Sequence, residues 1–177
     1  MGIDNRPETM TGFIRTAAGI LALFWMCVIF AFSAQEQEES SAVSETFSYR
    51  MVRSADSLFG FDWDDEKLHA IAGAIEGYVR KAAHMTEYAV LSVLLYIWLG
   101  KRRFTTGKKM LLAIIITAFY AVSDEIHQLF VAGRSGRFTD VLIDSAGAVL
   151  GVLLFTGVKK CISFLWNRRR YRGTESS

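Results

Sequence analysis

The sequence has 177 residues, of which 51% are hydrophobic and 21% are charged, and its formal net charge is only +2. This length favours a single domain, and the small net charge gives no sign of a nucleic-acid-binding protein. The two cysteines, Cys27 and Cys161, lie in or beside different apolar runs, which excludes a disulfide framework and a cysteine-based zinc site.

Four apolar runs divide the chain, and each approaches the length of about 20 residues that a helix needs to cross a bilayer. They cover about residues 13–32, 79–99, 110–131 and 140–158. Charged segments separate them, which argues against a soluble protein with buried helices. We predict an all-α integral membrane bundle of four transmembrane helices, with a membrane domain over 13–158, an N-terminal tail over 1–12 and a basic tail over 159–177.

The charges between these runs are unevenly distributed. Basic residues follow the second run (Lys101, Arg102, Arg103, Lys108, Lys109) and the fourth run (Lys159, Lys160, Arg168, Arg169, Arg170, Arg172), whereas the segment after the first run is acidic. Because basic loops remain in the cytoplasm, we predict a multi-pass cell-membrane protein with both termini cytoplasmic and with 33–78 and 132–139 outside. Topology and anionic lipid explain the basic clusters, so no nucleic-acid partner is expected.

The first run, 13–32, is almost free of polar residues after Thr16, which is typical of a membrane anchor. A signal peptide is the alternative, because Arg15 precedes the apolar stretch and Ala31-Phe32-Ser33 imitates a small-x-small cleavage site. The length of the run favours an uncleaved helix.

The external segment contains no apolar run long enough to span a membrane. Its acidic and serine-rich beginning, 35–45, favours a solvated loop or a frayed helix. Apolar residues then recur at helical spacing over 46–59, which predicts an amphipathic extracytoplasmic helix that stops at Gly60. Asp62, Asp64 or Asp65 would cap the next helix, 66–78. We expect these helices to lie on the outer membrane surface; a lid that gates a substrate site is the alternative.

The second run carries charged residues in its first turns. Lys81, His84 and Tyr88 share one helical face, and Glu87 follows His84 by three residues. Arg80 and Lys81 could simply extend their charged ends to the outer interface. His84 and Glu87 lie deeper, where this explanation suits them less.

The third run becomes polar as it approaches the outer surface, where Ser123, Asp124, His127 and Gln128 occupy one broad face. Gly133, Arg134 and Gly136 follow in a short turn, and the two glycines suit backbone conformations with positive φ.

The fourth run begins with Asp140 and Asp144 on the same face as Gly147 and Gly151. The two glycines form a GxxxG pair, which lets a neighbouring helix approach closely. Both aspartates should therefore point into the bundle.

The predicted orientation places these polar residues in one layer within the outer third of the membrane. The layer contains Gln35, Lys81, His84, Glu87, Ser123, Asp124, His127, Gln128, Arg134, Asp140 and Asp144. One interpretation is a structural network that pairs Arg134 with Asp140 or Asp144, and Lys81 with Glu87 or Asp124. The other is a functional site, because the layer has more ionisable groups than four short helices require.

For a functional site, acid–base chemistry is the leading hypothesis, and no cofactor is expected. His84, Glu87, Asp124 and Asp140 are the catalytic candidates. Lys81, Gln128, Arg134, Asp144 and Gln35 are the substrate-binding candidates, with the cations suited to phosphate or a developing oxyanion. A metal held by the histidines and carboxylates is one alternative, and a Ser123–His127 nucleophile is another. Proton-coupled transport is the non-enzymatic alternative and would require a homo-oligomer, since no inverted repeat is visible.

Three stretches resemble one known family. SDEIHQLFVAGRSGRFTDVLIDSAGAVLG (123–151), KAAHMTEYAVLSVLL (81–95) and FSAQ (32–35) are similar to the VanZ-like membrane proteins, in the family's order. The resemblance implies a membrane bundle and, from the family's association with teicoplanin, a role in glycopeptide or envelope-stress resistance. It does not imply a particular reaction, so an enzyme and a binding protein both remain open. We expect the bilayer and a lipid-linked or anionic envelope molecule as partners.

Overall fold

The computed structural model describes residues 6–100 and 104–174, with side chains described over 10–100 and 104–168. Within these ranges the chain forms five α-helices and no strand, so the all-α prediction is confirmed. The helices are α1 (Arg6–Ser33), α2 (Gln37–Phe59), α3 (Asp65–Trp98), α4 (Thr106–Gln128) and α5 (Phe138–Thr174). Some of the basic residues that predict the topology lie outside the described part of the chain. These are Lys101, Arg102 and Arg103, together with the side chains of Arg169, Arg170 and Arg172.

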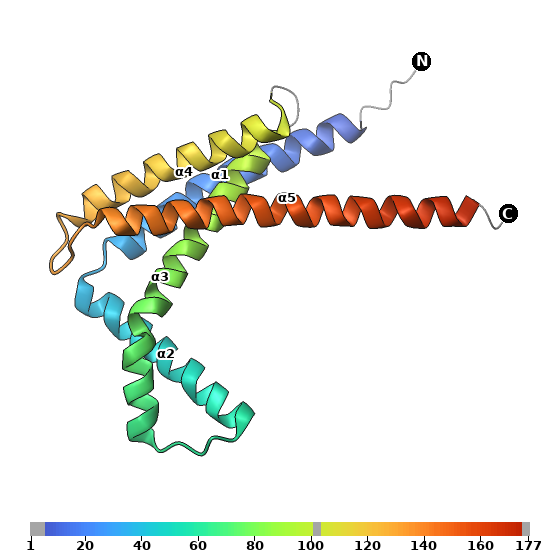
Figure 1. Cartoon of the computed structure of the whole chain (residues 1–177). Helices are drawn as coiled ribbons and strands as arrows, with labels where there is room; N and C mark the ends of the chain where they lie inside the picture. Colours follow the sequence, from blue (N-terminus) through green and yellow to red (C-terminus); the bar gives the residue numbers. More distant parts are fainter. Residues whose placement is uncertain (1–5, 101–103, 175–177) are drawn as a thin grey trace.

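Helix α3 organises the fold, because it contacts every other helix. Figure 1 shows α1, α4 and α5 running in similar directions, with α4 in contact with both others and the second half of α3 crossing them obliquely. The first half of α3 leaves this bundle and forms a hairpin with α2. The beginning of α1 and the end of α5 point to one side of the bundle, and the α1–α2 and α4–α5 connections lie at the other (Figure 1).

Three helical segments among the described residues are long and apolar enough to cross a membrane: Met10–Ser33, Thr106–Gln128 and Phe138–Arg168. They coincide with the first, third and fourth predicted spans. The second predicted span, 79–99, lies in α3, which is not one of the three. Its apolar residues instead supply much of the protein core, since Tyr88 and Leu91 are fully buried and Leu95 nearly so.

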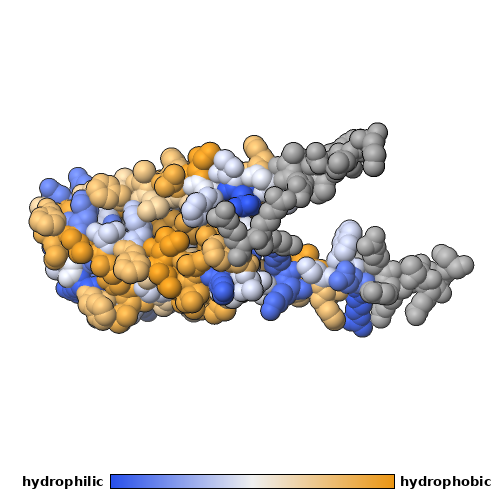
Figure 2. All heavy atoms as spheres, turned by 90° about the horizontal axis from the view of Figure 1, so that it is seen from above, coloured by the Kyte–Doolittle hydropathy of each residue, from blue (hydrophilic) through white to orange (hydrophobic). Residues whose placement is uncertain are grey.

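The surface of the bundle has the character of a membrane-facing belt. Large apolar side chains are exposed along α1, α4 and α5, among them Phe24, Leu111, Phe119, Leu150 and Leu154. Figure 2 shows hydrophobic residues along much of the visible face, with hydrophilic residues gathered toward its two ends. Exposed apolar surface of this extent indicates contact with lipid or another protein.

Helix α3 runs without a break from Asp65 to Trp98, whereas the sequence predicts a separate helix over 66–78 before the span. The backbone continues because the stretch contains no proline, and the interior glycines Gly73 and Gly77 weaken a helix without ending it. Asp64 caps the helix as expected: its carboxylate accepts a hydrogen bond from the Lys67 backbone N–H at 2.9 Å.

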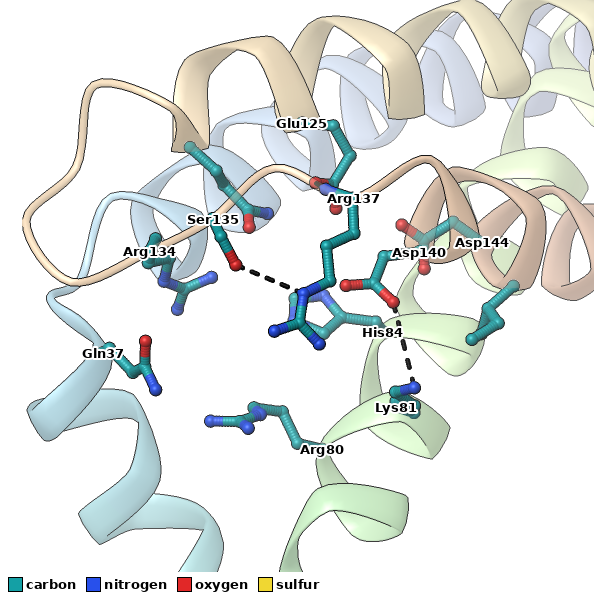
Figure 3. A pocket seen from close by; sticks show the side chains of 12 residues that line it. Gln37, Arg80, Lys81, His84, Glu125, Arg134, Ser135, Arg137, Asp140 and Asp144 are labelled. Atoms are coloured by element: carbon teal, nitrogen blue, oxygen red, sulfur yellow. Dashed lines mark hydrogen bonds and ion pairs between the residues drawn. The ribbon is translucent and has the colours of Figure 1, made fainter.

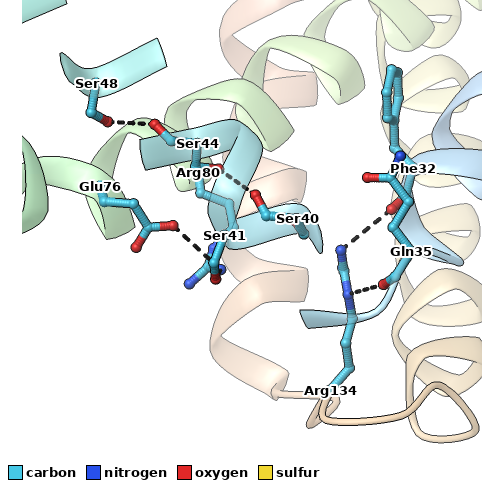
Figure 4. A network of polar contacts seen from close by, with 9 residues as sticks. All are labelled: Phe32, Gln35, Ser40, Ser41, Ser44, Ser48, Glu76, Arg80 and Arg134. Carbon is cyan, nitrogen blue, oxygen red and sulfur yellow. Dashed lines mark hydrogen bonds and ion pairs between the residues drawn. The ribbon is translucent and has the colours of Figure 1, made fainter. Parts of the chain in front are cut away.

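Helix α2 begins at Gln37, so of the two alternatives for 35–45 the structure has a helix over most of the segment rather than a solvated loop. Serine disfavours helices when its hydroxyl competes for backbone groups, but here the hydroxyls bond within the helix. Ser44 Oγ donates to the Ser40 carbonyl and Ser48 Oγ to the Ser44 carbonyl (Figure 4). The helix ends at Gly60, as predicted, with a φ of 66° that favours glycine.

The hairpin buries only part of the apolar surface of α2. Val52 packs against Leu68 and Ala72 of α3 in a small core of their own. By contrast, Phe47 and Leu58 remain 61% and 78% exposed. The hairpin therefore presents a second apolar surface away from α3.

The predicted close contact at the GxxxG pair is confirmed between α5 and α3. A Cβ atom at Gly147 would overlap the Met85 carbonyl, and one at Gly151 would overlap the Ala89 carbonyl. The approach also allows Ser92 Oγ of α3 to donate to the Ala148 carbonyl of α5 at 2.9 Å. This crossing fixes α3 beside the beginning of α5.

Candidate functional site

A polar cavity of about 140 Å³ lies where the α1–α2 and α4–α5 connections meet α3 (Figure 3). Four parts of the chain line it: the start of α2, α3, α4, and the α4–α5 loop with the start of α5. The lining residues are Gln37, Arg80, Lys81, His84, Glu125, Gln128, Arg134, Ser135, Arg137, Asp140, Ile143 and Asp144. Six of the nine predicted site residues are brought together here: Lys81, His84, Gln128, Arg134, Asp140 and Asp144.

Helical spacing explains why these side chains share one cavity. Lys81 and His84 are separated by three positions on α3, Glu125 and Gln128 by three on α4, and Asp140 and Asp144 by four on α5. Residues three or four apart lie on the same face of a helix. The tight α3–α5 crossing then brings two of these faces together.

Arg134 does not pair with Asp140 or Asp144, contrary to the predicted structural network. Its Nε donates to the Gln35 carbonyl at 3.0 Å, and its Nη2 donates to the Phe32 carbonyl at 3.3 Å (Figure 4). The Phe32 carbonyl lies in the last turn of α1, where helical acceptors have no partner within the helix, and the Gln35 carbonyl lies in the α1–α2 connection. Arg134 therefore fastens the α4–α5 loop to the end of α1.

The same connection explains the two loop glycines. Gly133 has a φ of 73°, as predicted, and lies against Gln37 at the start of α2. For Gly136 the expectation of positive φ is wrong. This residue is needed for close approach instead, since a Cβ atom there would meet the Glu125 carbonyl oxygen at 2.6 Å.

The environment of Arg134 affects its charge only slightly. Burial lowers the pKa of the Arg134 guanidinium, and the neighbouring positive charge of Arg80 lowers this pKa further. An arginine still remains protonated in a protein, because its pKa lies so far above neutral. Two cations therefore face the same region of the cavity.

Lys81 also differs from the predicted network. Its Nζ lies 4.0 Å from Asp140 Oδ1 rather than beside Glu87 or Asp124. Both side chains are partly solvated, with 50% of Lys81 and 33% of Asp140 exposed. Such a pair contributes little to stability, about 0–1 kcal/mol.

His84 and Glu87 lie together, but only His84 lines the cavity. His84 Nδ1 is 3.3 Å from Glu87 Oε2, which places the carboxylate behind the imidazole ring. The other ring nitrogen, Nε2, is therefore the one that remains for a ligand. A carboxylate that orients a histidine in this way is a common feature of acid–base sites.

Asp124 lies in the protein core and does not line the cavity. Its Oδ2 accepts a hydrogen bond from Gln128 Nε2 at 3.2 Å. Its Oδ1 and the Tyr88 hydroxyl are both buried and have no hydrogen-bond partner among the described residues. Asp124 is thus positioned to orient Gln128, which does line the cavity, rather than to contact a ligand.

Gln35 and the Ser123–His127 pair, which the sequence also suggested, do not line the cavity. Gln35 contributes its backbone carbonyl to Arg134, and Gln37 is the glutamine whose side chain lines the cavity. The proposed Ser123–His127 pair does not form: Ser123 Oγ donates to the Tyr120 carbonyl at 2.7 Å, and the His127 ring lies against Phe30.

Sequence reasoning missed Gln37, Arg80, Glu125 and Arg137 as site residues. Glu125 Oε2 accepts a hydrogen bond from the Arg137 backbone N–H at 2.9 Å, which fixes the loop just before α5. A signal for Glu125 was available, since it precedes Gln128 by three residues on the same helix. Arg80 was identified but assigned to the interface, and Arg137 lies beside the turn without a periodic pattern of its own.

The described residues include no group of three or more His, Cys, Asp or Glu side chains in an arrangement that could hold a metal ion. The side chains considered as metal ligands lie in two different places: His84, Asp140 and Asp144 line the cavity, whereas Asp124 lies in the core.

These features define a class of protein: an all-helical bundle with membrane-class helices and a charged cavity at one end. Residues 18–161 match the VanZ/LLP1 family, which is most of the chain. The chain therefore belongs to the VanZ-like family of membrane proteins, as the motifs indicated. Comparisons with curated proteins and with solved structures find no match.

Proposed function

We propose that this VanZ-like protein is a multi-pass protein of the cell membrane that binds the headgroup of an amphiphilic cell-envelope molecule. The observation that carries the proposal is the cavity: charged side chains from α3, α4 and the α4–α5 loop with the start of α5 surround it, and only Lys81 and Asp140 of them lie as a pair, at 4.0 Å. Charged residues beside membrane-class helices are costly, so their convergence indicates a ligand or ion pathway.

The proposed topology has four spans, with α3 as the second, and both termini in the cytoplasm. The start of α1 and the end of α5 share one side of the bundle, and the cavity lies near the other (Figure 1). The basic residues Lys159 and Lys160 near the far end of α5 favour the cytoplasm for that side. The cavity then lies in the outer leaflet, at the level where lipid headgroups meet the hydrocarbon.

In this arrangement the α2–α3 hairpin is extracytoplasmic and lies along the outer membrane surface. Its exposed apolar side chains, including Val43, Phe47 and Leu58, would enter the lipid interface. Arg50 and Arg53 on the same helix would remain near the lipid headgroups. The hairpin also bounds the cavity, since Gln37 and Arg80 both line it.

Acid–base chemistry on the bound molecule is a second candidate function. It is favoured by the contact of Glu87 with His84 Nδ1 at 3.3 Å, which leaves Nε2 of this cavity-lining histidine available to a ligand. Asp140 and Asp144 on the opposite wall supply further proton acceptors. The family resemblance suggests glycopeptide or envelope-stress resistance as the cellular role.

Binding is tested by filling the cavity. The full chain would be purified from membranes in mild detergent, and retained amphiphiles would be identified by native mass spectrometry. We expect wild type to retain an envelope amphiphile and Ile143→Trp to lose it, because Ile143 lines the cavity. The matched control is Leu142→Trp, at the neighbouring position on α5, where the side chain is 54% exposed and faces away from the core.

Folding is monitored by the thermal melt of each variant. If Ile143→Trp does not fold, Ser135→Tyr tests the same cavity from its exposed loop. Retention of the same amphiphile by wild type and a folded cavity-filled variant would contradict the proposal. A protein that carries no amphiphile, and that unfolds when Lys81 or Asp140 is neutralised, would favour the structural network.

A further inference from the structure

Three guanidinium groups converge on the cavity from different parts of the chain. Figure 3 shows Arg80 of α3 and Arg134 and Arg137 of the α4–α5 loop directed toward the same space. Lys81 lies at its edge, beside Asp140. Converging like charges repel one another, so the arrangement is unfavourable unless an anion lies between them.

Each guanidinium is oriented by a partner outside the centre of the cavity. Arg134 is held by the Phe32 and Gln35 carbonyls, and Arg137 Nε donates to Ser135 Oγ at 3.2 Å. Arg80 Nη1 donates to Ser41 Oγ at 3.0 Å and lies 3.5 Å from Glu76 (Figure 4). Within the described part of the chain, Glu76 is the only carboxylate in an ion pair with any of the three.

The carboxylates that line the cavity do not take this role. Glu125 accepts the Arg137 backbone N–H, and Asp140 lies beside Lys81. Asp144 is buried at the start of α5, on the wall opposite Arg80 and Arg134 (Figure 3). The cavity therefore has a guanidinium side and a carboxylate side.

We propose that the guanidinium side binds the phosphate group of a lipid headgroup, with Arg80, Arg134 and Arg137 as its donors. This inference rests on the proposed function and specifies its ligand chemistry. Guanidinium forks match the tetrahedral oxygens of a phosphate through paired hydrogen bonds, and three guanidinium groups can donate to its several oxygens together. The carboxylate side accepts hydrogen bonds from hydroxyl or amine groups attached to that phosphate.

The cavity also sets a limit on size. Its volume of about 140 Å³ holds a small polar group, and the rest of the molecule must remain outside it. The exposed apolar surface of the bundle lies beside the cavity end and would receive acyl or prenyl chains (Figure 2). A phosphate joined directly to a lipid meets both requirements.

The test uses the full chain in detergent and three probes: a short-chain phosphatidic acid, the matching diacylglycerol without phosphate, and inorganic phosphate. Affinity is measured by native mass spectrometry and by the rise in melting temperature. We use Arg137→Gln and Arg80→Gln, which keep hydrogen-bonding capacity and remove charge. Arg168→Gln is the matched control, because Arg168 is exposed on the second half of α5 and does not line the cavity.

We expect phosphatidic acid to stabilise wild type and Arg168→Gln equally, and diacylglycerol to stabilise neither. Each cavity variant should bind phosphatidic acid about tenfold more weakly or worse, the order expected for a lost hydrogen bond to a charged group. Protection by inorganic phosphate equal to that by phosphatidic acid would identify free phosphate as the ligand and overturn the lipid assignment.

Unchanged affinity in both cavity variants would overturn the phosphate site, and so would an equal loss in Arg168→Gln, which would show only a general attraction of charges. The proposed function is judged separately. It survives if wild type still retains an amphiphile that Ile143→Trp loses, and it fails together with the phosphate site if wild type retains none.

Discussion

At the scale of single residues, arginine side chains connect the ends of helices. Arg134 donates to the Phe32 carbonyl at the end of α1 and to the Gln35 carbonyl just after it, and Arg15 Nε donates to the Trp98 carbonyl at the end of α3 at 3.3 Å. Positive groups are favourable at helix C-termini, where the carbonyl dipoles leave partial negative charge. Arg134 thus has a structural role at the wall of the cavity and also presents a positive charge to it.

This double role predicts a specific effect of Arg134→Lys. A lysine cannot reproduce the planar fork that reaches both carbonyls, so the variant should lose about 1–3 kcal/mol of stability without ligand. Thermal unfolding of the purified protein measures the loss, and Arg137→Lys is the control, because its side chain contacts only Ser135 within the described chain. Since Arg134 and Asp140 form no pair, Asp140→Asn should add to the loss independently. Recovery of stability in the double variant would contradict this prediction and would indicate that Arg134 and Asp140 form an internal ion pair.

At the scale of elements, the α3–α5 crossing determines the geometry of the cavity. Gly147 and Gly151 allow the two backbones to touch, and the contact at Met85 lies one residue after His84. Any displacement of α5 from α3 would therefore separate His84 from Asp140 and Asp144. Helices in lipid have no hydrophobic driving force for association, so close van der Waals packing, which small residues allow, stabilises such crossings.

The crossing predicts that alanine substitutions at two glycines of α5 have different effects on stability. Gly147→Ala should destabilise the protein by about 1–3 kcal/mol, because the new methyl group overlaps the Met85 backbone carbonyl, which cannot turn aside. Gly157→Ala should cause no loss, since no atom lies within 4 Å of its added Cβ and alanine favours helix. Unfolding in a graded detergent series compares the two variants. Equal stability of both would show that the close contact does not form.

At the scale of the whole molecule, the direction of insertion decides where the cavity functions. The bundle has one end with the cavity and the two helix–helix connections, and another with the outer ends of α1 and α5 (Figure 1). The apolar belt between these ends matches a protein that crosses the bilayer along the axes of α1, α4 and α5. Only one of the two orientations exposes the cavity to the outer leaflet.

Cysteine labelling measures this orientation. Cys27 and Cys161 are both free and exposed, so they are first replaced by serine. In that background we expect Ser135→Cys to react with an impermeant thiol reagent on intact cells, and Gly107→Cys to react only after permeabilisation. Gly107 has no atom within 4 Å of an added Cβ, so the substitution fits there. Labelling of Gly107→Cys alone on intact cells would place the cavity at the cytoplasmic face.

The sequence alone determined the helices, three membrane-class segments and most of the polar residues at one end of the bundle. Local patterns carry this information: apolar runs set helix length, helical spacing places Asp140 and Asp144 on one face, and Gly60 and Asp64 mark helix ends. A close approach to another helix at Gly147 and Gly151 was also evident from the GxxxG pair, but the structure identifies α3 as the partner helix.

Only the tertiary structure decided which side chains meet. Arg134 finds backbone carbonyls near residue 35, about a hundred positions away in sequence, and Lys81 finds Asp140. Glu125 and Arg137 join the cavity because the loop folds back onto α4. The burial of α3 behind its neighbours also has no local signature. Hydropathy and spacing act over one or two helical turns, whereas these pairings depend on distances set by the packing of whole helices.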